Sequence, residues 1–365
     1  MSKKVLHIFG IMNRGGAELR TLDTLSPLAK KGVALEFCAL TGRQGVLDQG
    51  IVAQQSKVHY CRLGVLFPLR FFLLLKKHNF DCVHSHVADV SGVILFIAWL
   101  AGVKQRIAHY RSTQVSAQTS LVKKMRNRCF KQLIDWFATD IIGVCNAALN
   151  AFWSNNWQQD KRCRVIYNGL QRPPISTKQP EYWHQFKLTK DLPVVINIAR
   201  MDPPKNHGFI IDVFIALFKK QPCYLVLVGK ENTTVKHALL ERLEAENLTE
   251  YVLFAQEQAN VYPFIQHANA MLFPSLWEGL PGAVIEAASL GLPVISSALA
   301  GVDEIAQYLP CVKQLPLTAE ISAWETALTN AFAQTEESQQ QAQHAFTQSP
   351  FNITLCVESL YAVYK

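Results

Sequence analysis

Two acidic residues, Glu278 and Glu286, frame a stretch whose residue types suit the binding of a phosphorylated sugar. Seven residues separate them in the run E-G-L-P-G-A-V-I-E, which follows the apolar segment Ala270–Phe273. Pro281 suits the first position of a helix and Gly291 suits the residue after its end. Free amides at such a helix start favour phosphate or sugar oxygens, and the two carboxylates can accept hydrogen bonds from hydroxyl groups. The alternative is an ordinary loop acid and a glutamate that is merely favoured by the helix dipole.

Two cations, Arg200 and Lys205, form a second constellation. They lie in the segment A-R-M-D-P-P-K-N-H-G, directly after the apolar run Val194–Ile198. An arginine fork and a lysine point charge at the carboxyl end of a strand can hold a diphosphate and stabilise the charge that develops when it leaves. The alternative is a pair of ordinary loop cations.

Three further residues lie at or soon after the ends of strand candidates in the first half. Gly15 and Gly16 come soon after the apolar run Val5–Phe9, and they let the backbone approach a ligand and begin a helix. His109 ends the candidate strand Arg106–His109, where a side chain at the carboxyl edge of a sheet can meet a ligand. A plain turn and a structural histidine are the alternatives.

The elements that position these residues alternate between short apolar runs and helical patterns. In the first half, strands are expected at Val5–Phe9, Ala34–Leu40, Val58–Cys61, Cys82–His84, Arg106–His109 and Ile141–Val144. In the second half, they are expected at Val194–Ile198, Tyr224–Val228, Val252–Phe254, Ala270–Phe273 and Pro293–Ser296. Strands that alternate with helices predict parallel sheets of the α/β class. Because the pattern occurs twice, we expect two Rossmann-like domains with a ligand cleft between them.

The 365 residues suit about two domains. We expect an N-terminal domain over residues 1–170 and a C-terminal domain over 171–345. The turn Asn168-Gly169 and the stiff linker Arg172-Pro173-Pro174 join them. A final apolar helical pattern covers Ile353–Tyr364, within the last segment of residues 346–365.

Charge is unevenly distributed between the two halves. Residues 1–170 carry a net charge of +14 and the remainder −6, for +8 in total. The basic half suits anionic lipid or a phosphorylated acceptor. Nucleic acid is disfavoured because no zinc-finger or RRM signature is present. The nine scattered cysteines lack any C-x-x-C pair and fit small buried side chains of a reducing compartment.

Membrane contact is expected to be peripheral at most. The uncharged stretch Val90–Val103 has 14 residues, fewer than the roughly 20 of a span, and predicts a buried helix. Basic and apolar residues mix at Phe67–Lys77 and Leu121–Trp136, which is typical either of helices on an anionic membrane or of packed helices with a solvated basic face. We expect a cytoplasmic protein whose membrane contact is peripheral and confined to the inner face of the membrane.

The run E-G-L-P-G-x-x-I-E-A-x-x-x-G-x-P-V-I resembles the signature of glycosyltransferase family 4, of the kind that builds bacterial surface polysaccharides. The likeness is most specific over residues 194–305. It implies the GT-B fold, in which a last helix within residues 346–365 crosses back to the first domain. It also implies the retaining transfer of a hexosyl or N-acetylhexosaminyl group from a nucleoside-diphosphate sugar to a glycan or lipid-linked acceptor. Family frequency favours UDP over GDP. The resemblance implies no cofactor and no metal, in agreement with the lack of a D-x-D triplet.

The resemblance also assigns roles. Glu286 holds the ribose, Glu278 contacts the donor sugar, and Arg200 with Lys205 clamps the diphosphate. His109 lies beside the sugar, and the glycine pair Gly15-Gly16 contacts the donor phosphate or the acceptor. The remaining donor-site residues are Gly279, Leu280, Pro281 and Gly282.

Two segments depart from the family pattern, and two other functions stay open. Phe254-Ala255-Gln256-Glu257 stands where relatives usually have a glycine, and Ala300–Glu304 keeps one glycine of a usual pair, so the base is left undetermined. A GT-B sugar-nucleotide epimerase would release an isomer without any acceptor. A non-catalytic protein that binds nucleotide sugars would show no turnover at all.

Overall fold

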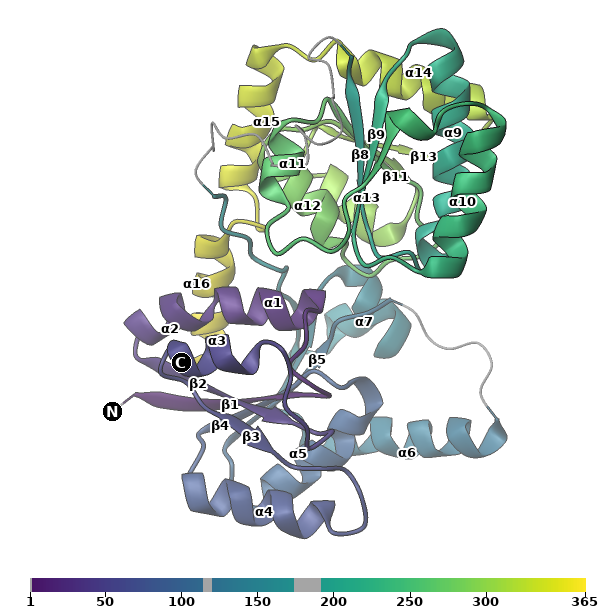
Figure 1. Ribbon diagram of the computed structural model, residues 1–365. Helices are drawn as coiled ribbons and strands as arrows, with labels where there is room; N and C mark the ends of the chain where they lie inside the picture. Colours follow the sequence, from purple (N-terminus) through teal and green to yellow (C-terminus); the bar gives the residue numbers. More distant parts are fainter. Residues whose placement is uncertain (1, 114–119, 174–191) are drawn as a thin grey trace. The chain divides into compact units, whose positions relative to one another are not determined.

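The computed structural model describes residues 2–113, 120–173 and 192–365 (Figure 1). It contains two compact units. The first unit comprises Met1–Gln171 together with Pro350–Lys365, and the second comprises Arg172–Ser349. The division after Gln171 lies next to the expected domain boundary at residues 170 and 171. Of the expected linker, Pro174 lies outside the described residues.

The described strands of the first unit form a parallel sheet in the order β3-β2-β1-β4-β5-β6-β7. These strands are β1 Lys3–Phe9, β2 Val33–Ala39, β3 Val58–Tyr60, β4 Cys82–Ser85, β5 Gln105–Tyr110, β6 Asp140–Gly143 and β7 Cys163–Val165. Its helices are α1 Gly16–Asp23, α2 Leu25–Lys30, α3 Asp48–Ala53, α4 Phe67–His78, α5 Ser91–Leu100, α6 Leu121–Phe137, α7 Asn146–Phe152 and α16 Ile353–Tyr364. The chain builds β1, β2 and β3 outward in one direction and then crosses to β4 on the other side of β1.

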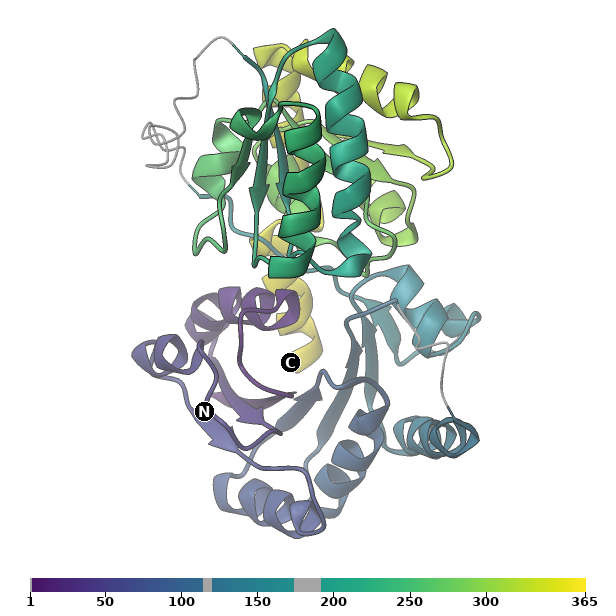
Figure 2. The ribbon, with the colours of Figure 1, turned by 45° about the vertical axis from the view of Figure 1, so that its right-hand side comes forward.

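The second unit repeats this plan with the sheet order β10-β9-β8-β11-β12-β13, all parallel. Its strands are β8 Val194–Ile198, β9 Tyr224–Val228, β10 Val252–Phe254, β11 Ala270–Phe273, β12 Val294–Ser297 and β13 Val312–Leu315. Its helices are α9 His207–Lys220, α10 Thr233–Ala245, α11 Tyr262–Gln266, α12 Gly282–Ser289, α13 Ala300–Ala306, α14 Ile321–Phe332 and α15 Glu336–Gln348. Helices α9 and α10 run side by side over one face of the sheet (Figure 2).

Both sheets are covered on their faces, which explains their nearly continuous apolar strands. Strands β9 and β11 are buried along their whole length. Helix α9 turns Ile210, Phe214 and Leu217 toward this core, at the spacing of one helical face. The predicted fold class, α/β with two Rossmann-like parallel sheets, is confirmed.

The edge strands β7 and β13 were not expected from the sequence. Both are short and only partly buried. An edge strand has a paired neighbour on one side only, so it lacks the long apolar run that marks a central strand. The strand expected at Pro293–Ser296 is β12, which begins at Val294 because proline has no amide hydrogen to donate to the sheet.

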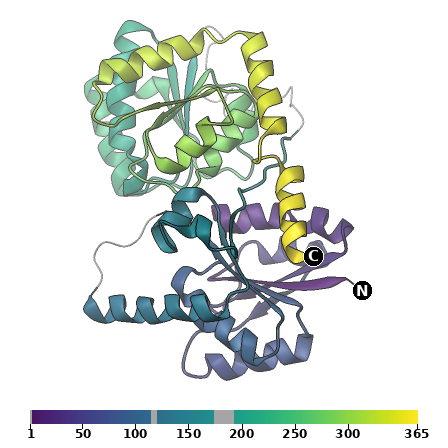
Figure 3. The same cartoon turned by 180° about the vertical axis from the view of Figure 1, so that it is seen from behind.

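The chain returns to the first unit through α16, which lies alongside α2 (Figure 3). Leu170 donates its amide hydrogen to the Phe351 carbonyl at 2.8 Å and accepts one from Ile353 at 3.1 Å. The return begins at Pro350 rather than at residue 346, because α15 continues to Gln348 and its last turn buries Phe346. A side chain at Gly169 would lie 2.4 Å from Cys356 Cβ, so this turn needs glycine to admit the helix.

Candidate active site

The loops that follow β8 and β11 carry the predicted donor-site residues of the second unit. Strands β8 and β11 are neighbours, and the order of the sheet reverses between them. Ligands of open α/β sheets bind at this point, beyond the carboxyl ends of the strands. The sheet topology therefore brings together two loops, residues 199–206 and 274–281, that are about 75 positions apart in sequence.

Backbone hydrogen bonds fix these two loops to one another. Leu276 donates its amide hydrogen to the Pro204 carbonyl at 2.8 Å. The Asn206 side-chain amide donates to the Pro274 carbonyl at 3.2 Å, and Asn206 itself adopts the left-handed conformation with φ 56°. Asparagine tolerates that conformation better than most residues. Asn206 thus joins the loops just where Lys205 needs a fixed direction.

Lys205 and Glu278 form an ion pair across the two loops, through Nζ and Oε1. Their side chains are 19% and 13% exposed, so water screens the pair less than it would at the surface. The Nζ atom also lies 5.6 Å from the centre of the Phe273 ring, a favourable contact for a cation. The structure thus brings together one residue predicted to bind the diphosphate, Lys205, and one predicted to bind the sugar, Glu278.

Arg200 follows β8 directly and is more open to solvent. Its guanidinium pairs with Asp202 of the same loop at 3.3 Å, and its side chain is 66% exposed. Such a surface pair is worth about 0–1 kcal/mol, which leaves Arg200 able to turn toward a phosphate. The backbone beneath it is tightly packed, because a side chain at Gly229 would lie 2.0 Å from the Ala199 carbonyl oxygen.

Helix α12 begins at Gly282, and Pro281 is its N-cap rather than its first helical residue. The extended conformation of Pro281, with ψ 110°, explains this one-residue shift from the expected position. Glu286 is half-buried and lies about one turn inside the helix. Gly291 follows the helix end with φ 74°, the left-handed conformation that the C′ position requires.

The two departures from the family pattern have structural explanations. Gly301 is the second residue of α13 and packs against the loop of residues 274–281, where a side chain would lie 1.6 Å from the Gly279 carbonyl oxygen. This close approach places Gly279 and Leu280 against α13. Gln256 keeps a left-handed φ of 56°, and its carbonyl accepts the Gly229 amide hydrogen at 2.8 Å. The backbone shape that a glycine would favour is therefore present with glutamine instead.

Sequence reasoning missed His207, the first residue of α9. It is buried, and its Nδ1 atom has no hydrogen-bond partner within residues 2–113, 120–173 and 192–365. Burial and the neighbouring Lys205 lower its pKa to about 4, so the ring is neutral at pH 7. The available signal was a histidine two residues after Lys205, in the segment that follows β8.

In the first unit, Gly15 is the N-cap of α1 and Gly16 is its first residue. A side chain at Gly15 would lie 2.2 Å from a Glu18 carboxylate oxygen, so Glu18 folds back over the helix start. Burial raises the pKa of Glu18. The chain's own carboxylate thus lies at this helix terminus, where the sequence pattern predicted contact with a ligand.

His109 belongs to a cluster with the buried His7 and His84 and the half-buried His86. The cluster lies where the strand order of the first unit reverses between β1 and β4. It is 2% exposed, and its Nδ1 atom lies 3.0 Å from His84 Nε2. Burial lowers its pKa well below the usual value, and the Arg111 guanidinium lowers it further. His109 is therefore neutral at pH 7.

Two groups of three side chains in the described part of the chain place potential metal ligands within 4.8 Å of one another. They are His7 with His84 and His86, and Glu36 with His59 and His78. In the first group the Arg111 Nε atom lies 3.2 Å from His86 Nδ1, and this cation opposes a metal ion there. In the second group the Glu36 carboxylate accepts a hydrogen bond from the His59 ring at 2.6 Å.

A pocket of about 500 Å³ lies at the carboxyl edge of the first sheet. Its walls come from the segments after β1, β2, β3 and β4, and are largely apolar. Two arginines, Arg43 and Arg62, lie among Ile11, Leu40 and Leu63. Cations beside apolar side chains suit a ligand with an anionic head and a hydrocarbon part.

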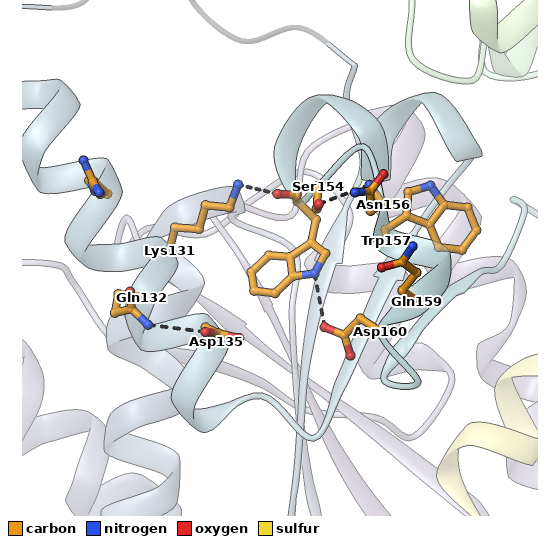
Figure 4. Close-up of a pocket in the computed structure, with 10 residues that line it drawn as sticks. Lys131, Gln132, Asp135, Ser154, Asn156, Trp157, Gln159 and Asp160 are labelled. Carbon is orange, nitrogen blue, oxygen red and sulfur yellow. Dashed lines mark hydrogen bonds between the residues drawn. The ribbon is translucent and has the colours of Figure 1, made fainter.

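A second pocket, of about 560 Å³, lies between α6 and the segment that leads into the amino end of β7 (Figure 4). Lys131 of α6 donates to the Trp153 carbonyl, and the Trp153 indole donates to Asp160 at 3.3 Å. Most of its polar groups are thus engaged with one another. Its place near the amino ends of the strands separates it from the predicted site residues.

The two predicted basic stretches are the helices α4 and α6. Helix α4 buries Phe67, Phe71 and Leu75 but exposes Leu69 and Leu73. Helix α6 exposes Val122, Met125 and Trp136. The apolar stretch from Val90 forms α5, a largely buried helix as predicted. None of the helices in the described residues combines the length and apolar character of a membrane span.

Both units match families of known proteins. A family model described as Glycosyltransferase Family 4 matches residues 14–171, and one described as Glycosyl transferases group 1 matches residues 192–328. The capsular polysaccharide biosynthesis glycosyltransferase CapH of Staphylococcus aureus is 34% identical over 310 residues, which cover 84% of each chain. The putative glycosyltransferase EpsF of Bacillus subtilis is 25% identical over 373 residues, covering 100% of this chain and 96% of that protein.

A similar solved structure is that of Anabaena HepE in complex with UDP and glucose. It has a TM-score of 0.82 and 17% sequence identity, over 99% of this chain and 98% of that one. At this identity the likeness establishes a shared fold.

Proposed function

Because the chain belongs to glycosyltransferase family 4 and has the GT-B fold, we propose that it transfers a sugar from a UDP-sugar to a glycan or lipid-linked acceptor in the synthesis of a surface polysaccharide. The observation that carries the donor half of this proposal is the Lys205–Glu278 ion pair at the switch point of the second sheet. Similar proteins supply the rest: one acts in capsule biosynthesis, and another was crystallised with UDP and glucose.

The donor fits the groups around this ion pair. Lys205 holds the diphosphate as a fixed point charge, and Arg200 turns from the surface to add a forked contact. Glu278 accepts hydrogen bonds from hydroxyls of the sugar, and Glu286 accepts them from the ribose. The amide groups at the start of α12 add a positive dipole next to the phosphates.

The reaction proceeds with retention of the anomeric configuration. The bond from the anomeric carbon to the diphosphate oxygen breaks, and the acceptor hydroxyl forms its bond to the same face of that carbon. The acceptor proton passes to the leaving phosphate oxygen, so no side chain is needed as a base. Lys205 and Arg200 stabilise the charge that builds on the departing diphosphate.

The acceptor binds to the first unit in the pocket with Arg43 and Arg62. The two arginines suit a diphosphate, and the apolar walls suit the adjoining lipid chain. The exposed apolar and basic residues of α4, including Leu69, Leu73 and Arg70, support contact between this unit and an anionic membrane surface. This contact is peripheral.

Donor binding and turnover test the proposal separately. A panel of nucleotide sugars is screened by thermal shift, since the true donor stabilises the folded protein by mass action. Turnover is then measured with that donor, with and without a lipid-diphosphate-linked sugar as acceptor. Transfer that requires the acceptor is expected. An isomer formed from the donor alone would indicate an epimerase, and stabilisation without any turnover would indicate a binding protein.

A further inference from the structure

Four histidine side chains from three neighbouring strand ends fill the switch point of the first sheet. His7 of β1 pairs with His84 of β4, and the alternation of side chains puts His86 and, on β5, His109 on the same face. Neighbouring ring centres are 4.4 to 5.1 Å apart. Tyr364 of α16 packs edge-on against this row.

The hydrogen bonds in this row have a direction, which begins at Arg111. Its Nε atom donates to His86 Nδ1 at 3.2 Å, and a guanidinium group has no acceptor. A neutral His86 therefore carries its proton on Nε2. That atom lies 2.8 Å from His7 Nδ1, which must accept, so the proton of His7 is also on Nε2.

The same reasoning fixes the direction of the hydrogen bonds from His7 through Tyr364 to His84 and His109. His7 Nε2 donates to the Tyr364 hydroxyl at 3.2 Å, and the hydroxyl hydrogen then bonds to His84 Nδ1 at 2.7 Å. His84 Nε2 donates to His109 Nδ1 at 3.0 Å. His109 is left with its proton on Nε2. This atom is buried and has no hydrogen-bond partner in the part of the chain that the structure describes.

We propose that this one-way chain of hydrogen bonds presents His109 to the substrate as an Nε2–H donor, with Tyr364 as the positioning residue that transmits the order. The unpartnered N–H then pairs with a lone pair of a substrate oxygen. A ring held in this tautomer cannot take a proton at Nε2. The inference rests on the proposed function, in which the leaving phosphate takes the acceptor proton.

The surroundings keep the histidine rings and the Tyr364 phenol of this hydrogen-bond chain neutral. Burial lowers the pKa values of His84 and His86 well below the usual value, and it raises that of Tyr364, so the rings and the phenol remain neutral. Arg111 is fixed in turn, since it donates to Asn168 Oδ1 and, at 3.1 Å, to Thr21 Oγ1. The donor that sets the direction therefore cannot rotate away at little cost.

The ring proton of His109 is measured by NMR of the full-length protein labelled with ¹³C,¹⁵N-histidine, with His109→Gln used to assign the signal. We expect a protonated Nε2 and an unprotonated Nδ1. In Tyr364→Phe the link to His84 is lost, so the His109 signal should change to a mixture of tautomers. The matched variant Tyr361→Phe, on the same helix, should leave it unchanged. A wild-type His109 protonated on Nδ1 would overturn the proposal, as would a His109 signal that Tyr364→Phe does not alter.

Turnover gives an independent readout. His109→Gln keeps an N–H donor near the position of Nε2, whereas His109→Glu has the same shape with acceptors only. We expect the glutamine variant to have at least about tenfold higher kcat than the glutamate variant. The reverse order would show that His109 acts as a base and would overturn the proposal. A wild-type protein without turnover would refute the proposed function, whereas the tautomer is decided by NMR alone.

Discussion

The two units place different chemistry at the same topological point. In the second unit, the loops at the β8–β11 switch carry a lysine and a glutamate that remain partly open to solvent and pair with each other. In the first unit, the β1–β4 switch is filled by neutral imidazoles and the half-buried Arg111. Charged side chains next to solvent can bind a charged ligand, whereas a buried row of neutral rings can only fix the direction of its hydrogen bonds. The shared fold supplies the location, and the side chains decide what it does.

The largest expected difference between the two units is the loss of stability on acidification. Burial lowers the pKa of His7 to about 3, and those of His84, His86 and His109 also fall, whereas the second unit has His207 at about 4. Unfolded histidines bind protons below about pH 6.5, so the stability present above that pH falls as the pH drops toward 3. Each such histidine contributes a slope of about 1.4 kcal/mol per pH unit.

Hydrogen exchange at pH 7 and pH 5, corrected for the intrinsic exchange rate, measures this difference. The sheet of the first unit should lose more protection than the sheet of the second. An equal loss in both units would contradict the assignment of neutral buried histidines to the first.

Removal of the lysine should have the largest effect on catalysis. Lys205→Ala should lower kcat by about 10²–10³, or about 3–4 kcal/mol, because the charge on the departing diphosphate loses its fixed partner. Lys219→Ala is the matched control, since Lys219 lies near the far end of α9 and pairs with Glu246 at 2.9 Å on the surface. Steady-state kinetics with saturating donor measure both. Normal turnover in Lys205→Ala would refute the site in the second unit.

Loss of the ribose contact should appear in donor binding. Glu286→Ala should raise the donor KM by about tenfold, the equivalent of about 1.4 kcal/mol, because a charged hydrogen-bond acceptor is removed from the ribose. Titration with UDP alone should show the same loss of affinity. An unchanged KM and an unchanged affinity for UDP would exclude Glu286 from the donor site.

Removal of the Tyr364 hydroxyl should cost stability in the first unit only. Tyr364→Phe should lower the free energy of unfolding by about 1–3 kcal/mol, since His7 and His84 each lose a buried hydrogen-bond partner. Tyr361→Phe, at a partly exposed position of α16, should change it by less than about 0.5 kcal/mol. Urea unfolding of both variants provides the measurement. Equal values would mean that the hydroxyl is not part of a buried network.

The smallest expected effect is a gain in stability. Gly50 lies inside α3, and a side chain there would meet no atom within 4 Å. Gly50→Ala should therefore stabilise the protein by about 0.5–1 kcal/mol. Gly301→Ala is the contrasting change, because its side chain would lie 1.6 Å from the Gly279 carbonyl oxygen and should lower both stability and donor affinity. Thermal unfolding with and without UDP distinguishes the two.

Much of the donor side could be predicted from local sequence. The strands Val194–Ile198, Tyr224–Val228 and Ala270–Phe273 begin and end where expected, because buried parallel strands are apolar throughout. Edge strands such as Cys163–Val165 escaped notice because partial exposure weakens that pattern. The N-cap role of Pro281 depends on one backbone angle that its neighbours set.

The sequence by itself determined the order of strands and helices, the type of side chain that follows each strand, and the glycines that permit close packing. These are local properties, which hydrophobic pattern and backbone sterics control. Only the tertiary structure decided which of those side chains meet. Lys205 joins Glu278, and His7 joins Tyr364 from the far end of the chain, since the crossover between strands brings distant segments to one edge of a sheet. Contacts of that range follow from topology, which no short motif contains.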